Sequence, residues 1–140
     1  DRWGQLDLWP HSAIHAAPLS PAPSVAVKDW TKSIAINATA PSVLIPYVAP
    51  LLGQSGRAVF FDDPRAGEKF FGAYGASKAA QRALARSGQA ETIKTGPKVK
   101  ILTPQPMPTA LRARFFPGED RAPLNDCQAE AARLLPQILA

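Results

Sequence analysis

Apolar and polar residues alternate along this chain in blocks that predict strands and helices in turn. Three short apolar runs predict buried strands, at residues 6–9, 57–61 and 99–102. Apolar residues from Val43 to Leu52 recur at helical spacing and predict one face of a helix over residues 30–52. Asp29 is a plausible N-cap for this helix, and Gly53 is a natural end. Prolines inside the helix predict kinks, at Pro41, Pro46 and Pro50.

The other segments also carry start and stop signals. A helix over residues 73–92 is predicted from its Ala, Lys, Gln and Arg content, and Gly96-Pro97 ends it. Thr109 or a neighbour starts a short helix through Arg114, and Asp126 caps a last helix over residues 127–139. We expect Pro10 to end the first strand and the Pro/Ala/Ser-rich stretch 11–27 to form a loop.

Alternation of strands and helices predicts an α/β fold with a parallel sheet and right-handed crossovers. Ligands bind such sheets at the carboxyl ends of the strands. Asp62 and Asp63 follow the second strand, and the loop that begins at Pro104 follows the third. These residues are therefore expected to meet at the edge where a ligand would bind.

The bulk composition narrows the class of protein. The chain has 140 residues, of which 46% are apolar and 19% charged, which suits one domain with a sizeable core. Asp1–Gln5 lacks a signal-peptide pattern, and no uninterrupted apolar run is long enough to span a bilayer. The single cysteine, Cys127, favours a reducing compartment, so we expect a cytoplasmic protein. An abrupt start at Asp1, directly before a strand, suggests a piece of something longer.

Charge and histidine spacing add little to this picture. The net charge is +5 and the pI about 9.7, which is compatible with a polyanion partner. Lys and Arg are scattered without a run, however, so nucleic-acid binding is not expected. His11 and His15 lie four residues apart without a third ligand, and no metal site is predicted.

The most informative chemistry is the segment Tyr74-Gly-Ala-Ser-Lys78. A phenol and an ammonium four residues apart on a helix share one face. A nearby positive charge stabilises a phenolate and lowers the pKa of the phenol. Such a tyrosine can pass a proton to or from an alcohol or carbonyl near neutral pH.

Four landmarks in this order resemble the short-chain dehydrogenase/reductase family, over nearly the whole chain. Leu6-Asp7-Leu8 resembles the family's L-D-x-L strand, and Asn37 matches its catalytic asparagine. Tyr74 and Lys78 match its Y-x-x-x-K pair, with Ser77 and Ala79 beside the lysine. Pro104 and Thr109 match the ends of its P-G-x-x-x-T segment. The resemblance identifies residues 1–140 as the C-terminal portion of one Rossmann-like domain, a partial three-layered parallel sheet.

The resemblance implies transfer of a hydride between a nicotinamide cofactor, NAD or NADP, and a carbonyl or alcohol carbon. Tyr74 would be the acid/base, Lys78 would lower its pKa and bind the nicotinamide ribose, and Asn37 would hold a water in the proton relay. Pro104 and Thr109 would contact the nicotinamide. The helices over residues 30–52 and 73–92 would form the interface of a homo-oligomer.

Several positions depart from the family pattern. No Ser or Thr occurs from Arg57 to Ala73, where the family has a catalytic serine, and Asp62-Asp63 stands there instead. These aspartates are either a new acid/base pair or a turn, and their charge would raise the pKa of Tyr74. The N-N-A-G position reads His11-Ser-Ala-Ile, and Gln105 replaces the glycine of P-G.

A further departure concerns the cofactor's phosphates. No G-x-x-x-G-x-G or G-x-G-x-x-G motif occurs in the chain, so the glycine-rich βαβ half of the Rossmann-like domain is lacking from it. Two functions stay open at this point. The chain is either part of an NAD(P)-dependent oxidoreductase or an impaired relative that serves as a dimerisation or binding domain.

Overall fold

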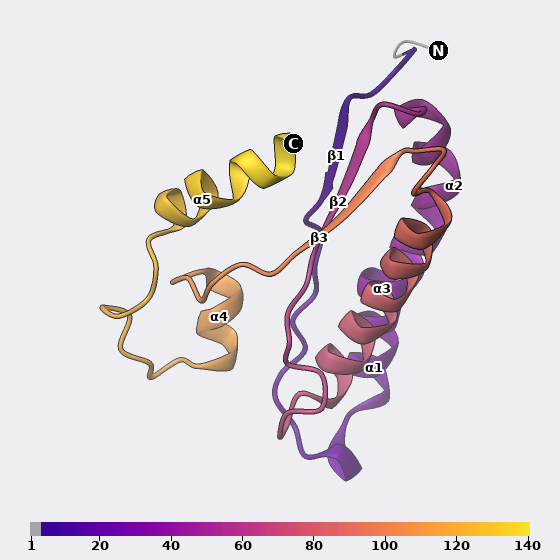
Figure 1. The fold of residues 1–140 in the computed structure, drawn as a ribbon. Helices are drawn as coiled ribbons and strands as arrows, with labels where there is room; N and C mark the ends of the chain where they lie inside the picture. Colours follow the sequence, from indigo (N-terminus) through magenta and orange to yellow (C-terminus); the bar gives the residue numbers. More distant parts are fainter. Residues whose placement is uncertain (1–3) are drawn as a thin grey trace.

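A three-stranded parallel sheet forms the centre of the computed structural model, which describes residues 4–140 (Figure 1). Strands β1 (Leu8–His11), β2 (Arg57–Phe61) and β3 (Lys98–Leu102) lie side by side in that order. Leu8 pairs with Arg57, and Arg57 pairs with Lys98. The parallel α/β fold predicted from the sequence is confirmed, and β2 has the predicted bounds.

The first strand lies two residues later than predicted and includes Pro10. The expectation that Pro10 ends the strand was therefore wrong. Strand β1 is an edge of the described sheet, where a proline N–H is not needed for the ladder. The interpretation that Asp1–Gln5 lacks a signal-peptide pattern falls in part on residues 1–3, which lie outside the described residues.

One long helical segment connects β1 to β2. It consists of α1 (Val27–Ile34), a π-helical turn (Ala35–Thr39) and α2 (Ala40–Leu52). Asp29 is not the N-cap, because the helix begins three residues earlier than predicted and Asp29 lies in its first turn. Gly53 ends the segment with a φ of 57°, a left-handed conformation that glycine adopts without steric cost.

Helix α3 (Gly72–Glu91) connects β2 to β3, and α4 (Ala110–Phe115) and α5 (Cys127–Leu139) follow. Two caps predicted from the sequence are present. Thr109 Oγ1 accepts a hydrogen bond from the Arg112 N–H. Asp126 accepts two from the first turn of α5. Side-chain caps therefore fix the starts of both C-terminal helices.

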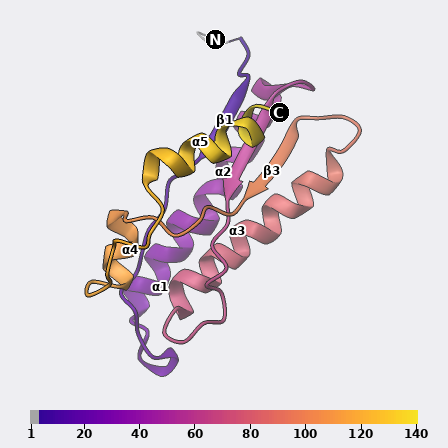
Figure 2. The ribbon, with the colours of Figure 1, turned by 60° about the vertical axis from the view of Figure 1, so that its left-hand side comes forward.

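The elements form three layers (Figure 1). The long segment of α1 and α2 lies beside α3 on one face of the sheet, and α5 lies across the other face, as a second view shows (Figure 2). Lys98 and Lys100 of β3 donate hydrogen bonds to the carbonyls of Ala140 and Gln137 at the C-terminal end of α5. These ammonium groups complement the partial negative charge of that helix end.

Two apolar clusters make up the core. One packs between the sheet and its helices, and contains Leu52, Ala58, Phe60 and Ala85. The other lies beyond the carboxyl ends of the strands, and contains Ala16, Phe71, Tyr74 and Phe115. The candidate acid/base Tyr74 is thus part of an aromatic cluster rather than a surface residue.

The segment Val27–Leu52 is long and apolar enough to cross a membrane by length and composition, although polar residues such as Lys32 and Asn37 interrupt its apolar run. This evidence is weak, since core helices of soluble proteins pass the same test. Within this segment Ser33 and Asn37 are fully buried.

Candidate active-site cleft

A cleft of about 380 Å³ opens at the carboxyl ends of the strands. Its wall includes the predicted site residues Asp62, Asp63, Tyr74, Lys78, Pro104 and Thr109. Parallel strands place their carboxyl ends at one edge of the sheet. This explains why Asp62 and Pro104, which are 42 positions apart in sequence, line the same cleft. Of the predicted residues, Asn37 lies behind the wall and reaches the cleft only through its neighbours on α3.

Tyr74 donates a hydrogen bond to an aspartate rather than interacting with lysine. Its hydroxyl lies 2.9 Å from Asp63 Oδ2. The tyrosine ring is 3% exposed and packs edge-on against Phe115, with ring centroids 4.8 Å apart. Asp63, in the stretch of sequence where the resemblance leads us to expect a serine, is therefore a polar partner of the Tyr74 hydroxyl.

The environment raises the pKa of Tyr74 well above its ordinary value of 10. Burial is the largest cause, followed by the charge of Asp63 and its hydrogen bond, while Arg65 opposes the shift. The net shift is therefore upward, because desolvation and the carboxylates both favour the neutral phenol, in the direction expected for aspartates at this place. At neutral pH the side chain is a protonated hydroxyl.

The Lys78 ammonium donates hydrogen bonds to groups within the protein. Its Nζ donates to the Phe61 carbonyl at 2.6 Å and to Gln81 Oε1 at 2.7 Å. Burial lowers the pKa of Lys78, although the charges of Asp62 and Asp63 oppose the shift. An ammonium has three donors, so one N–H of Lys78 is left to face the cleft.

Gln81 joins Lys78 to Asn37. Pro41 has no N–H, so it cannot bond the carbonyl four residues earlier, that of Asn37. The freed carbonyl accepts a hydrogen bond from Gln81 Nε2 at 2.9 Å, while Gln81 Oε1 accepts from Lys78. The resemblance implied a water held by Asn37, but in this structure the Gln81 amide bridges Asn37 and Lys78.

Both polar atoms of the Asn37 side chain form hydrogen bonds with neighbouring segments. Its Oδ1 accepts from the His15 N–H at 2.7 Å, and its Nδ2 donates to the His15 carbonyl and to Ser77 Oγ. Asn37 sits in the π-helical turn, a feature common at functional sites, and is 0% exposed. It therefore ties the loop after β1 to α3.

The two adjacent aspartates have different partners. Asp62 Oδ2 pairs with Arg82 at 3.2 Å on α3, whereas Asp63 Oδ1 lies 3.6 Å from Arg65 Nε. The guanidinium of Arg65 stacks on Phe71 and Phe116, 5.5 and 5.0 Å from the ring centroids. Asp63 is thus the carboxylate that faces Tyr74, and an anchored arginine partly compensates its charge.

Close packing holds the loop that carries Asp63 and Arg65 against α3. A Cβ at Gly75 would lie 2.9 Å from Ala66 Cα and 3.2 Å from the Arg65 carbonyl oxygen. Real Cβ atoms do not approach a backbone so closely, so only glycine fits here without a shift.

The last residue of β1 adds a histidine to the cleft. His11 is 6% exposed, its ring packs against Trp9 and Phe60, and its buried Nε2 has no partner among the described residues. Burial and the charge of Lys78 lower the pKa of His11, so its imidazole is neutral at pH 7. Within residues 4–140, no group of three His, Cys, Asp or Glu side chains could hold a metal ion.

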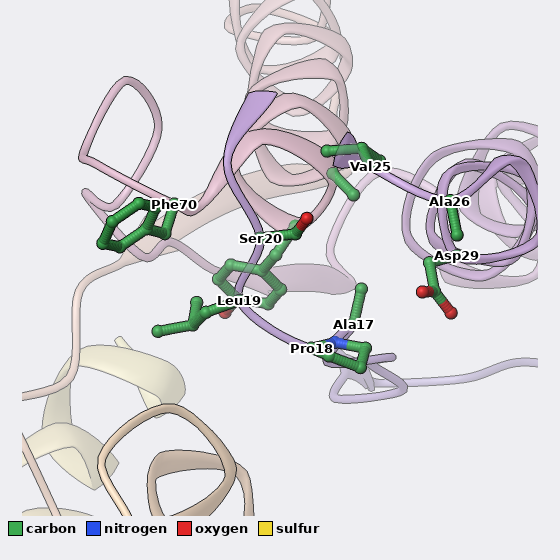
Figure 3. Close-up of a pocket in the computed structure, with 10 residues that line it drawn as sticks. Ala17, Pro18, Leu19, Ser20, Val25, Ala26, Asp29 and Phe70 are labelled. Carbon is green, nitrogen blue, oxygen red and sulfur yellow. The ribbon is translucent and has the colours of Figure 1, made fainter. Parts of the chain in front are cut away.

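A much smaller pocket lies between the loop before α1 and Phe70 (Figure 3). Its wall is formed by the loop before α1, the first turn of that helix, and Phe70, Ala73 and Tyr74. The volume of about 10 Å³ is enough for about one water molecule. The larger cleft is therefore the candidate ligand site.

The family model described as Enoyl-(Acyl carrier protein) reductase matches residues 1–133. The chain belongs to this family of short-chain dehydrogenases/reductases. The comparison with solved structures agrees with this assignment. A short-chain dehydrogenase from Salmonella enterica serovar Typhi is 25% identical with a TM-score of 0.91, over 99% of this chain and 58% of that one.

Two further short-chain dehydrogenase neighbours come from Escherichia coli. An oxidoreductase is 25% identical, and a second protein, solved in complex with NADPH, is 26% identical. Each has a TM-score of 0.86 over 99% of this chain and 58% of the other. A search of curated proteins found no match. This short-chain dehydrogenase/reductase chain thus spans a little over half the length of its structural neighbours.

Sequence reasoning missed three residues of the site. Gln81 lies three positions after Lys78 and so on the same helix face, a spacing that could have indicated it. Arg65 lies two positions after Asp63, a spacing that could also have indicated it, whereas the bond between Glu130 and the Gln105 N–H joins residues 25 positions apart and carried no local signal.

Proposed function

We propose that the protein of which this chain forms part is an NAD(P)-dependent oxidoreductase that interconverts an alcohol and a carbonyl compound. In this proposal Tyr74 and Asp63 together move the proton. The 2.9 Å hydrogen bond between Tyr74 Oη and Asp63 Oδ2, at the wall of the cleft, carries the proposal. The raised pKa of Tyr74 means that a second group has to take the proton.

The proton route follows from the capacity of a hydroxyl to donate and accept at once. In the oxidation direction, the substrate hydroxyl gives its proton to Tyr74 Oη while the proton of Tyr74 passes to Asp63 Oδ2. Tyr74 stays neutral throughout, and Asp63 ends as a carboxylic acid. Carbonyl reduction runs the same steps in reverse, so no tyrosinate has to form beside a carboxylate.

The groups at the cleft fit the nicotinamide end of the cofactor. The third N–H of Lys78 and the hydroxyl of Thr109 can donate hydrogen bonds to the oxygens of a ribose or a carboxamide. The segment that would hold the nicotinamide runs from Pro104 to Thr109, and both residues line the cleft. When bound, the nicotinamide supplies or takes the hydride at the substrate carbon. NAD and NADP both satisfy this donor set.

Binding and turnover test the proposal in the full-length protein. We expect NADH or NADPH to quench intrinsic fluorescence, and Tyr74→Phe to lower turnover by about 10²–10⁴-fold while the cofactor still binds. Absence of binding of both cofactors at millimolar concentration contradicts an oxidoreductase. Unchanged turnover in Tyr74→Phe contradicts the role of Tyr74.

The alternative function is that of an impaired relative that serves as a dimerisation domain. In its favour, α2 exposes Val43, Leu44 and Tyr47, which are 54%, 40% and 73% accessible. We propose that a second copy of the chain covers this apolar face, and both functions are compatible with that. Light scattering should show that Tyr47→Glu shifts the protein toward monomer, whereas Ile93→Glu, at an exposed apolar residue beyond α3, does not.

A further inference from the structure

Glu130 is a buried carboxylate that the proposed proton route does not use. It lies in the first turn of α5 and is 2% exposed. Oε1 accepts from the Gln105 N–H at 2.8 Å and from Arg133 at 2.5 Å, and Oε2 accepts from Arg133 Nε at 2.8 Å. Asn125 Nδ2 lies 3.5 Å from Oε2.

Burying a carboxylate is costly unless its oxygens are hydrogen-bonded. Arg133 and the Gln105 N–H lower the pKa of Glu130 to about 2, so it is an anion throughout the neutral range. Arg133 is about half exposed, with 46% of its side-chain surface accessible, and supplies charge from the surface. The bond to Gln105 is the one that reaches a different part of the molecule.

The segment that donates this hydrogen bond, residues 104–108, has few other hydrogen bonds to distant residues. Pro104, Pro106 and Pro108 have no N–H to donate. Among the described residues, two backbone hydrogen bonds join residues 104–108 to distant residues, and both lead to the start of α5. They run from the Gln105 N–H to Glu130 and from the Asn125 N–H to the Pro106 carbonyl, at 2.8 and 3.1 Å.

We propose that Glu130 is a positioning residue that holds the Gln105 backbone and thereby fixes the Pro104–Pro106 wall of the cleft. These three residues line the cleft directly, so a shift of the segment changes the shape of the site. Proline locks φ on both sides of Gln105, and holding this one peptide therefore constrains its neighbours as well. Because α5 packs across the other sheet face, Glu130 couples that helix to ligand binding.

Two matched variants of the full-length protein distinguish the effect of the length of the Glu130 side chain from the effect of its charge. Glu130→Gln keeps an acceptor within reach of the Gln105 N–H but removes the charge. Glu130→Asp keeps the charge but shortens the side chain by one methylene. We expect amide hydrogen exchange at Gln105 to be about tenfold or more faster in Glu130→Asp, and close to wild type in Glu130→Gln.

Exchange in β2 serves as the control for global stability and should be unchanged relative to wild type. Wild-type exchange at Gln105 in Glu130→Asp, or equal acceleration in both variants, overturns the proposal. Arg133→Ala, a change at a half-exposed side chain, leaves the carboxylate within reach. Slow exchange at Gln105 should persist in it, and fast exchange there overturns the proposal even if Glu130→Asp does not fold.

The effect on ligand affinity rests on the proposed function, whereas the exchange comparison does not. In a fluorescence titration with NADPH, we expect Glu130→Asp to raise the Kd by about five- to tenfold and Glu130→Gln to leave it within about twofold. Equal Kd values in these two variants overturn the link to the site. If the wild type binds neither NADH nor NADPH, the proposed function fails while the exchange result still decides the role of Glu130.

Discussion

The helix side and the loop side of the cleft hold their polar groups in different ways. On the helix side, Asn37, Ser77 and Gln81 are 0–3% exposed and bond one another or nearby backbone. On the loop side, Asp62 and Asp63 are half-buried and pair with arginines that are themselves partly exposed. The resemblance in the sequence rests in part on Asn37 and Ser77 of the helix side, whereas Asp62-Asp63 on the loop side is a departure from its pattern.

This difference indicates where the chemistry of a site can change. A buried network loses several bonds when one member changes, so its residue types are strongly constrained. A loop at a strand end is partly solvated, and a serine there can give way to an aspartate if an arginine compensates the charge. The departures from the family pattern therefore concern the proton route more than the scaffold.

The largest change in stability is expected when the helix-side network is broken. Gln81→Leu removes the hydrogen bond that Gln81 accepts from the Lys78 ammonium and the one that it donates to the Asn37 carbonyl. We expect the free energy of unfolding, measured in urea, to fall by about 3 kcal/mol. Gln89→Leu on the same helix removes an exposed bond to Val99 and should cost less than about 1 kcal/mol. Similar losses in the two variants would mean that the network is no more constrained than the surface.

The contact between the two sides should have an intermediate effect. Gly75→Ala forces the loop at Arg65 and Ala66 away from α3, at an expected cost of about 1–3 kcal/mol. Turnover should also fall, because the loop carries Asp63. Gly88→Ala is the matched control, since its Cβ would meet only Val99 Cγ2 at 4.0 Å and a helical alanine is favoured by about 1 kcal/mol. Thermal unfolding of both variants measures the contrast.

The smallest effect is expected for an ion pair on the loop side. Arg82→Ala removes the partner of Asp62, but the arginine side chain is 29% exposed and the pair is partly screened by solvent. A loss of no more than about 1 kcal/mol in urea unfolding is expected, and it should shrink in high salt. A loss as large as that of Gln81→Leu would remove the distinction between the two sides.

The sequence predicted the elements better than the contacts. A short apolar run placed β2 correctly, and a high content of good helix formers placed α3 within one residue. The predicted start of α1 was three residues too late. Aspartate is a common N-cap, so Asp29 was preferred to the weaker start signals in the residues before it. The presence of Tyr74 and Lys78 in the site was predicted, but the partner of Tyr74 depends on how a loop folds back onto α3. Local spacing contains no information on that contact.

The proton route through Asp63 is the central claim, and paired variants of the full-length protein test it most directly. Asp63→Asn removes the proton acceptor of Tyr74 but keeps the size of the side chain. Glu68→Gln, a second carboxylate that pairs with Arg65 but lies 49% exposed and away from Tyr74, is its control. In steady-state oxidation of an alcohol with NAD or NADP, we predict that Asp63→Asn lowers turnover at least about 100-fold and Glu68→Gln less than about threefold. Wild-type turnover in Asp63→Asn would contradict the relay.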